Sequence, residues 1–541
     1  MPFPGPADPA LPSPASRPAA AGAPPAGPDA ASFTSILFDR PVSEADVDGL
    51  PQPGCFADLN LDQVVAAATA GREQYRLAPF FYAPLSDVAG VRYRHEVIED
   101  LKLPGPLASV TGFARAMQHR REHLAQAGKL RYQLQQQAWF LDAAEIYCQA
   151  IGSLAEDLGG LDLHSRGLQE LRSYVGAYAS SAFFTSLAAQ TRALKQALAG
   201  VRYAIRIQGP RVTVTNYDGE PDYGAEVQET FAKFEQGAVR SYLARIPDFV
   251  EMDHVEAHIL DGVARLNPEV FGELAEYCDR YRDHLDKTMA RFDREVQFYL
   301  AYIELTERVR PGGLEFCYPQ VAARSGGISA AQAFDLALAA RLVPAGSTVV
   351  GNDFRMDGPE RIFVVTGPNN GGKTTFARMF GQLHYLASLG LPVPGTQARL
   401  FLPDRVYTHF EREEDIGTLR GKFEDELVRV HEILGQATGE SLLVMNESFN
   451  STTLSDALYV GTAVMRQILD IGLTGVYVTF VDEIAALAEA TVSMVSQIVP
   501  DDPAQRTFKV IRQPANGLAY AAAVADKYGL TYERLVVRIG S

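Results

Sequence analysis

The stretch RIFVVTGPNNGGKTTFARMFG, residues 361–381, decides the fold of the C-terminal part of this 541-residue chain. Four apolar residues, Ile362 to Val365, indicate a buried strand, which runs into a loop with three glycines and then into a helical pattern. Residues 367–374 match GxxxxGK[ST] between a strand and a helix, the context that identifies a phosphate-binding loop. The sequence therefore predicts a nucleotide cradle.

Each residue type in this loop has a physical task. Glycines let backbone N–H groups converge on phosphate, and the dipole of the following helix favours the negative charge. Lys373 would reach the β- and γ-phosphates, and the Thr374 hydroxyl would hold Mg²⁺. We expect ATP and Mg²⁺ as cofactors, with nucleotide contacts from Gly367, Pro368, Asn369, Asn370, Gly371, Gly372, Lys373, Thr374 and Thr375.

A second motif, SLLVMNE at residues 441–447, has the form of a Walker B strand. The residue before the glutamate is usually an acid, but Asn446 is an amide that brings no charge to Mg²⁺. Glu447 can orient and deprotonate an attacking water. We expect Glu447 and Lys373 to be the catalytic residues, and Thr374 and Asn446 to face the metal.

The remaining pattern predicts helices first and a sheet afterwards. Residues 56–200 read as mostly helical, and the last ~210 residues alternate strand-like and helical runs, as a mostly parallel α/β sheet does. Between them, residues 267–310 carry apolar side chains at spacings of three and four, which predicts one helix of roughly 60 Å. A helix broken in the middle of this range is the alternative.

Residues 202–219, RYAIRIQGPRVTVTNYDG, predict a β-hairpin with one apolar and one basic face. The surrounding residues 171–217 hold six basic residues and no Asp or Glu, although the net charge of the chain is -17. A basic face suffices for contacts to a phosphate backbone, which makes Arg202, Arg206 and Arg211 candidate DNA contacts. A solvated hairpin with ordinary surface arginines is the alternative.

Composition limits the other function classes. Residues 1–32 hold ten prolines, ten alanines and three charged residues, which predicts a disordered tail. Four widely spaced cysteines suggest neither a disulfide framework nor a zinc site. Without a secretory signal pattern or an apolar run of ~20 residues, the chain is expected to be cytoplasmic and to make no membrane contact.

These motifs together resemble the MutS family of ATPases. TGPNNGGKTT closely resembles the MutS phosphate-binding loop, and VVGNDF (349–354), with Val350 and Asn352, stands where the family places its adenine-contacting segment. EREEDIGTLRGKFEDEL (411–427), NESFNSTTLSDAL (446–458), VYVTFVDEIAAL (476–487) and FKVIRQPANGLAYAAAVA (508–525) resemble the following family segments. PLSDVAGVRYRHEVIEDL (84–101) resembles the entry to the MutS core.

The resemblance implies a multidomain fold. It consists of the tail 1–32, a mostly α-helical core and lever at 33–313 with a small clamp-like β-hairpin near 202–219, and an α/β P-loop (ABC-like) ATPase domain at 314–541. It also implies a homodimer that forms through the ATPase domains and shares two nucleotide sites. No Phe-x-Glu wedge motif precedes the core, so the mismatch-binding domain is expected to be missing.

Three positions depart from the family pattern. Asn446 replaces an aspartate, Gly421 stands where a signature serine contacts the partner's γ-phosphate, and Phe480 stands where a histidine usually follows the threonine. Losing one such contact commonly lowers the rate by about 10²–10³. We therefore expect ATP-gated DNA binding, related to DNA repair or recombination, with weak ATP hydrolysis. An ATP-gated dimeric interaction protein that binds no nucleic acid is the alternative.

Overall fold

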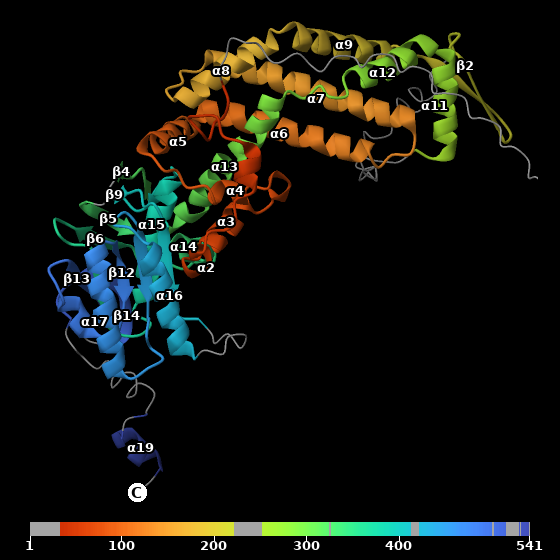
Figure 1. Ribbon diagram of the computed structural model, residues 1–541. Helices are drawn as coiled ribbons and strands as arrows, with labels where there is room; N and C mark the ends of the chain where they lie inside the picture. Colours follow the sequence, from red (N-terminus) through yellow and green to blue (C-terminus); the bar gives the residue numbers. More distant parts are fainter. Residues whose placement is uncertain are drawn as a thin grey trace, which may run out of the picture. The chain divides into compact units, whose positions relative to one another are not determined.

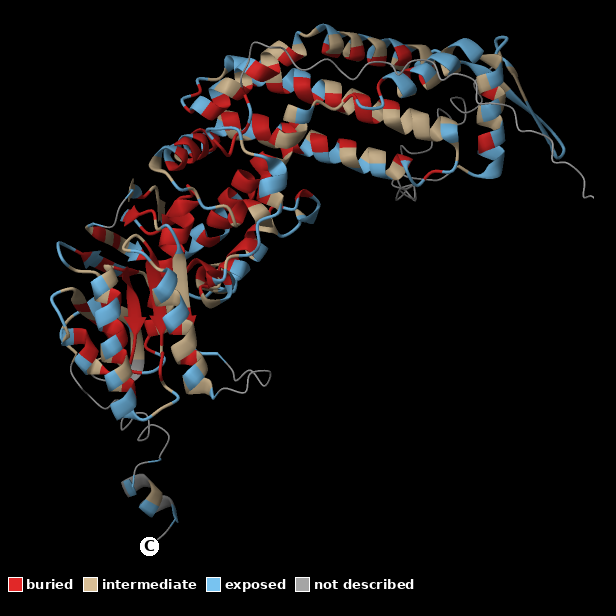
Figure 2. Ribbon diagram, viewed as in Figure 1, coloured by how far each residue is buried: buried red, intermediate tan, exposed pale blue. Residues whose placement is uncertain are grey.

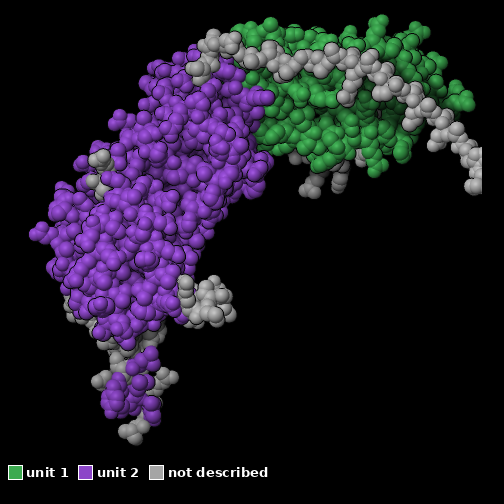
Figure 3. Space-filling view, viewed as in Figure 1, with its two compact units in different colours: residues 1–31, 115–156, 175–286 green, residues 32–114, 157–174, 287–541 purple. Residues whose placement is uncertain are grey.

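The computed structural model describes residues 33–220, 252–323, 326–412, 421–499, 502–515, 530 and 532–539. The chain divides into two compact units (Figure 3), with residues 1–31, 115–156 and 175–286 in unit 1 and residues 32–114, 157–174 and 287–541 in unit 2. The protein is therefore multidomain, as the sequence predicted. The predicted tail lies outside the described residues, and the predicted domain boundaries stay predictions.

Unit 1 is built mainly from helices (Figure 1). These are parts of α6 (Pro104–Ala127), α7 (Gln133–Gly160) and α8 (Arg166–Ala179), together with α9 (Ala182–Ala199), α11 (His254–Leu266) and α12 (Pro268–Arg280). Pairs of buried hydroxyl groups join them: Tyr147 donates to Tyr178 at 3.0 Å, and Thr191 lies 2.6 Å from the Tyr277 hydroxyl. Each pair satisfies groups that burial removes from water.

The single long helix predicted over residues 267–310 is wrong, and the broken alternative is right. Helix α12 ends at Arg280, and α13 (Lys287–Val309) starts in unit 2 after six intervening residues. Between them, buried His284 bonds back to the Tyr281 carbonyl through its amide and its ring, and the Asp286 amide donates to Tyr147 at 3.2 Å. These contacts hold residues 281–286 in a turn although the apolar spacing continues.

The predicted hairpin is confirmed. Strands β1 (Tyr203–Gln208) and β2 (Arg211–Asn216) pair antiparallel, with Gln208 opposite Arg211. The connection is therefore the two residues Gly209 and Pro210, and Gly209 has φ +62°, a conformation that favours glycine at the first position of a tight hairpin turn. The register puts Arg206 and Arg211 on one face and Ile205 and Val214 on the other.

Unit 2 contains the predicted α/β sheet. Six strands lie in the order β10 (Val406–Phe410), β11 (Leu442–Asn446), β12 (Thr474–Val478), β7 (Ile362–Thr366), β13 (Thr491–Val499) and β14 (Asp502–Arg512). All neighbours are parallel except β13 and β14. Strands β7, β11 and β12 are buried along their whole length, which matches their continuous apolar sequence (Figure 2).

Helices cover both faces of this sheet. On one face Ile362 and Val364 belong to a core cluster with residues of α16 (Lys422–Gln436) and α17 (Leu454–Ile471). On the other face Phe363 packs edge-on against Phe376 and Phe380 of α15 (Lys373–Ser388), with ring centroids 6.2 and 5.8 Å apart. The alternation of one strand therefore sets which helix lies on which side.

Smaller elements complete unit 2. A second sheet has the order β4 (Gln320–Ala322), β9 (Gln397–Phe401), β5 (Ile328–Ala333) and β6 (Asn352–Met356), and β3 (Phe316–Cys317) pairs with β8 (Val393–Pro394). The remaining helices are α1 (Glu44–Asp48), α2 (Cys55–Asp58), α3 (Leu61–Thr69), α4 (Ala78–Phe81), α5 (Val88–Leu101), α14 (Leu336–Leu342) and α19 (Tyr532–Ile539). None of the described helices has the length and apolar content that a membrane span requires.

Candidate functional site

A cavity of about 750 Å³ in unit 2 brings together segments that are far apart in the sequence. Its lining comprises residues 369–375 of the predicted phosphate-binding loop and α15, residues 348–350 with Asn352, and Glu447 at the end of β11. Leu338 and Leu342 of α14 and Phe508 of β14 complete it. Most of the residues that the sequence singled out for nucleotide binding therefore share one cavity.

The loop between β7 and α15 has the tight backbone that its glycines predicted. Gly367 and Gly372 have φ of +112° and +93°, which disfavour any residue with a Cβ. A Cβ on Gly371 would lie 2.5 Å from the Ser496 hydroxyl oxygen of β13. Gly372 caps α15 without a side-chain hydrogen bond, so the first amides of the helix face the cavity unblocked by a capping side chain.

Lys373 is held inside this loop. Its ammonium donates to the carbonyl oxygens of Gly367 and Pro368, at 2.9 and 3.1 Å, and to the side-chain oxygen of Asn369 at 3.3 Å. Burial lowers the pKa of Lys373 below its ordinary value, and the charge of Glu447 opposes that effect. Gly367 and Pro368 thus contribute carbonyl groups to the loop and do not line the cavity.

Asn352 lines the cavity, but its side-chain amide already forms hydrogen bonds to β14. Its nitrogen donates to the Phe508 carbonyl at 3.1 Å, and its oxygen accepts from the Val510 amide at 2.7 Å. Asn352 therefore fixes β14 beside the cavity, and β14 presents Phe508, whose side chain is 50% exposed and whose φ is +57°. Sequence reasoning missed Phe508, although it had recognised the segment that begins there.

The end of β11 places the two Walker B residues differently. Glu447 lines the cavity with φ +51°, and its amide donates to the Val478 carbonyl at 2.9 Å. Asn446 is buried between β10 and β12, and its side-chain oxygen has no hydrogen-bond partner among the described residues. A buried amide oxygen at the carboxyl edge of the sheet fits a water of a hydrated cation, and Thr374 lies in the same cavity.

The two other departures lie at exposed positions. Gly421 starts α16 with extended backbone, and a Cβ there would meet no atom within 4 Å. Phe480 follows β12 and is 49% exposed. Substitutions at these two positions therefore have room in the folded chain.

The hairpin arginines lie in unit 1. Arg206 forms an ion pair with Glu220 at 3.6 Å, and the Arg202 guanidinium lies 6.0 Å from the centroid of the Tyr217 ring. Arg206 and Arg211 share one face of the hairpin, as predicted. The side chains of Arg202, Arg206 and Arg211 therefore stand on the surface, with local contacts at two of the three positions.

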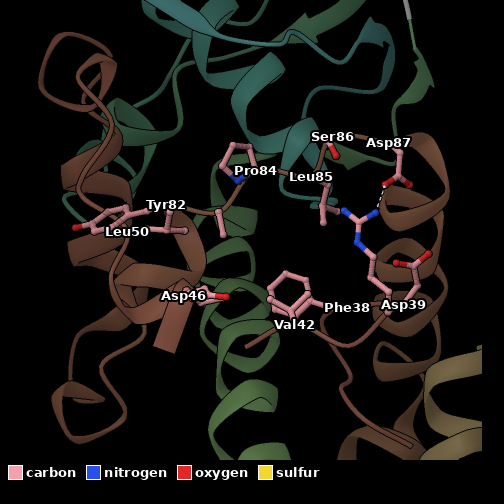
Figure 4. Close-up of a pocket in the computed structure, with 13 residues that line it drawn as sticks. Phe38, Asp39, Val42, Asp46, Leu50, Tyr82, Pro84, Leu85, Ser86 and Asp87 are labelled. Carbon is pink, nitrogen blue, oxygen red and sulfur yellow. Dashed lines mark ion pairs between the residues drawn. The ribbon is translucent and has the colours of Figure 1, made fainter. Parts of the chain in front are cut away.

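A second cavity in unit 2, of about 310 Å³, has different chemistry (Figure 4). Phe38, Val42 and Leu85 are among its apolar lining residues, and Asp39, Asp46 and Asp87 give its rim an acidic character. Its Arg40 is paired with Asp87 at 3.6 Å. Because carboxylates repel phosphates, the acidic residues of this second cavity disfavour a phosphate ligand there.

Comparisons with known proteins agree with the C-terminal motifs. Residues 363–535 match the family model of MutS domain V. The chain is 31% identical over 193 residues to the DNA mismatch repair protein MutS of Zymomonas mobilis, which covers 35% of this chain and 22% of that protein. It is 35% identical over 144 residues to the DNA mismatch repair protein MutS 2 of Halobacterium salinarum, covering 26% and 17%.

A third relative is the Endonuclease MutS2 of Thermus thermophilus, 29% identical over 188 residues, covering 34% of this chain and 25% of the relative. The matched part thus spans a quarter or less of the length of each of these three relatives. The predicted phosphate-binding loop, the strand that ends at Asn446 and the helices α15 and α16 all fall inside the family match. Through this C-terminal region, the chain is a MutS-related protein.

Proposed function

We propose that this protein binds ATP with Mg²⁺ in the cavity at the phosphate-binding loop and hydrolyses it slowly. The observation that carries the proposal is the meeting of Lys373, Thr374 and Glu447 in one cavity, from a helix start and a strand end that are ~70 residues apart. Lys373 binds the phosphates, Thr374 holds the hydrated cation and Glu447 orients the attacking water. Phe508 offers an aromatic wall for the base.

Slow turnover follows from the chemistry of three positions. Asn446 gives the cation an uncharged oxygen, Gly421 has no side chain to reach a partner's γ-phosphate, and Phe480 supplies no proton-transfer group. The residues that bind ATP are present, whereas these three polar contacts are replaced. The protein is therefore expected to bind nucleotide well and to hydrolyse it slowly. The protein then works as an ATP-gated dimer in which two ATPase domains pair.

The proposed target of the gate is DNA, in a role related to repair or recombination. Arg202, Arg206 and Arg211 on the exposed hairpin give a basic face in an otherwise acidic chain, and such a face contacts phosphates without reading sequence. The relatives named for DNA mismatch repair favour this target. The second candidate is an ATP-gated protein that holds a protein partner, which the net charge of -17 favours.

Equilibrium binding tests both parts. Wild type is expected to bind ATP with Mg²⁺, and Lys373→Ala to lose that binding, because the Lys373 ammonium lies inside the predicted phosphate-binding loop. An unchanged ATP affinity in Lys373→Ala contradicts the site. Binding to duplex or branched DNA with ATP, weakening as salt rises, favours the DNA target. No DNA binding at low salt leaves the protein-partner candidate.

A further inference from the structure

The turn that follows β11 has a strained backbone conformation, which needs stabilising contacts from neighbouring residues. Glu447 and Phe449 have φ of +51° and +66°, in the left-handed region that residues with a Cβ rarely occupy. Such conformations persist where neighbouring groups over-determine them. Because Glu447 lines the cavity, this turn decides where its carboxylate points.

Helix α16 supplies one set of contacts to the turn. The Glu426 side chain is 2% exposed, and one of its oxygens accepts from the Phe449 amide at 3.0 Å and from the Ser451 hydroxyl at 3.3 Å. Phe423 of the same helix packs edge-on against the Phe449 ring, with centroids 6.5 Å apart. Helix α16 therefore contacts Phe449 of the turn twice, at its backbone amide and at its aromatic ring.

Strand β10 supplies a second set. Fully buried His409 lies with Nδ1 2.7 Å from the Ser448 hydroxyl, and its ring stacks on Phe449 at 6.1 Å between centroids. Burial, together with the charge of Arg429, lowers the pKa of His409 to about 3, so the ring is neutral at physiological pH. Two residues from different elements thus hold the same short turn.

We propose that Glu426 and His409 are positioning residues, which hold the turn 447–451 so that the Glu447 carboxylate faces the bound nucleotide. Neither residue lines the cavity, so both act through the turn. The inference rests on the proposed function, because Glu447 has a task only where ATP is hydrolysed. Since Gly421, at the signature position, is the N-cap of α16, the same contacts connect that helix end to Glu447.

Steady-state kinetics of four variants of the full chain test this role. Glu426→Ala is expected to lower kcat ~10- to 100-fold, the usual cost of a small misplacement, with KM within about twofold. Glu426→Gln is expected to keep most of kcat, because its amide oxygen still accepts from the Phe449 amide. Glu424→Ala, at an exposed position two residues away, is the control and is expected to behave as wild type. His409→Phe keeps the stacked ring and loses the hydrogen bond, so its kcat is expected to lie between those of Glu426→Ala and Glu424→Ala.

Hydrogen exchange gives a readout that needs no ATP. In the nucleotide-free protein, Glu426→Ala is expected to exchange the Phe449 amide faster than wild type, whereas Glu426→Gln and Glu424→Ala keep its protection. Unchanged exchange together with unchanged kcat in Glu426→Ala overturns the proposal. A loss of kcat that Glu426→Gln shares fully, with ATP affinity falling in parallel, overturns it in favour of a general structural defect. If wild type binds no ATP, the proposed function fails, and the exchange data still decide whether Glu426 holds the turn.

Discussion

Replacing Asn446 by aspartate restores the acid that Walker B strands usually carry, and the structure gives the cost of that change. The Asn446 side chain is 7% exposed, and its oxygen accepts no hydrogen bond from the described residues. Burying an unsatisfied polar group costs about 1–3 kcal/mol, and more when the group is charged. We therefore expect Asn446→Asp to lower the free energy of unfolding by about 2–3 kcal/mol at pH 7 without metal.

Magnesium is expected to offset most of this destabilisation, because a bound cation stabilises a neighbouring carboxylate. Burial is expected to raise the folded-state pKa of the new carboxyl above its unfolded value of about 4. The destabilisation is then fully present above the folded pKa, decreases as the pH falls below that value, and is lost below ~4, where the group becomes protonated in both states. With Mg²⁺ and ATP at pH 7, the variant is expected to regain most of the lost stability and to hydrolyse ATP faster than wild type.

Thermal unfolding with EDTA measures the loss of stability without metal, and thermal unfolding with Mg²⁺ and ATP measures the stability that is regained. A loss of ~2 kcal/mol corresponds to a fall in Tm of roughly 4–8 °C for a domain of 150–250 residues. Asn446→Ala is the matched control: it removes the same amide without adding charge, so its Tm should not respond to metal more than that of wild type. Equal stability of Asn446→Asp and wild type in EDTA refutes the burial argument. An equal gain from Mg²⁺ and ATP in both proteins refutes the placement of residue 446 towards the metal.

Three other perturbations have clear expected outcomes. Gly371→Ala puts a Cβ 2.5 Å from the Ser496 hydroxyl and 2.9 Å from the Pro368 carbonyl oxygen, so the loop must shift. ATP affinity should fall ~10- to 100-fold in a calorimetric titration, and Tm should fall as well. Gly475→Ala puts a Cβ 2.1 Å from the Leu443 carbonyl of the neighbouring strand and should destabilise unit 2 by at least about 3 kcal/mol in denaturant unfolding, whereas wild-type stability would contradict the strand packing. Arg211→Glu should weaken binding to DNA and lower the slope of log K against log salt by ~1, measured by fluorescence anisotropy; an unchanged slope removes the hairpin from the interface.

The sheet and its loop were predictable because their signals are local. The alternation of strand-like and helical runs follows from apolar runs and breaks, and the structure has β7 and β11 where the runs at 362–365 and 441–447 lie. The hairpin follows from alternation and a Gly-Pro turn. The break between α12 and α13 was not predictable, because it depends on Tyr147, which is distant in the sequence and receives the Asp286 amide. A periodic pattern reports which face is apolar, and it carries no signal of a distant hydrogen bond.

The cavity was predictable in its chemistry and only partly in its construction. The motif identified Lys373, Thr374 and Glu447 from residue type and spacing, since phosphate and Mg²⁺ demand those groups. The motif could not show that the Asn352 side-chain amide forms hydrogen bonds to β14, which place Phe508 in the lining of the cavity. Both features depend on a strand more than 150 residues away. Contacts made by backbone groups leave no motif in the sequence.

Two of the positions that depart from the family pattern, Gly421 and Phe480, are exposed, whereas the turn at Glu447 is held by buried residues. Gly421 and Phe480 are exposed, so their side chains could change without disturbing the fold. The turn at Glu447, in contrast, keeps two strained residues, and each costs of order 1–3 kcal/mol unless its surroundings offset it. Buried Glu426 and His409 provide those surroundings. A relaxed turn would be more stable, so these strained residues and their buried partners support the proposal that the Glu447 carboxylate acts on a nucleotide.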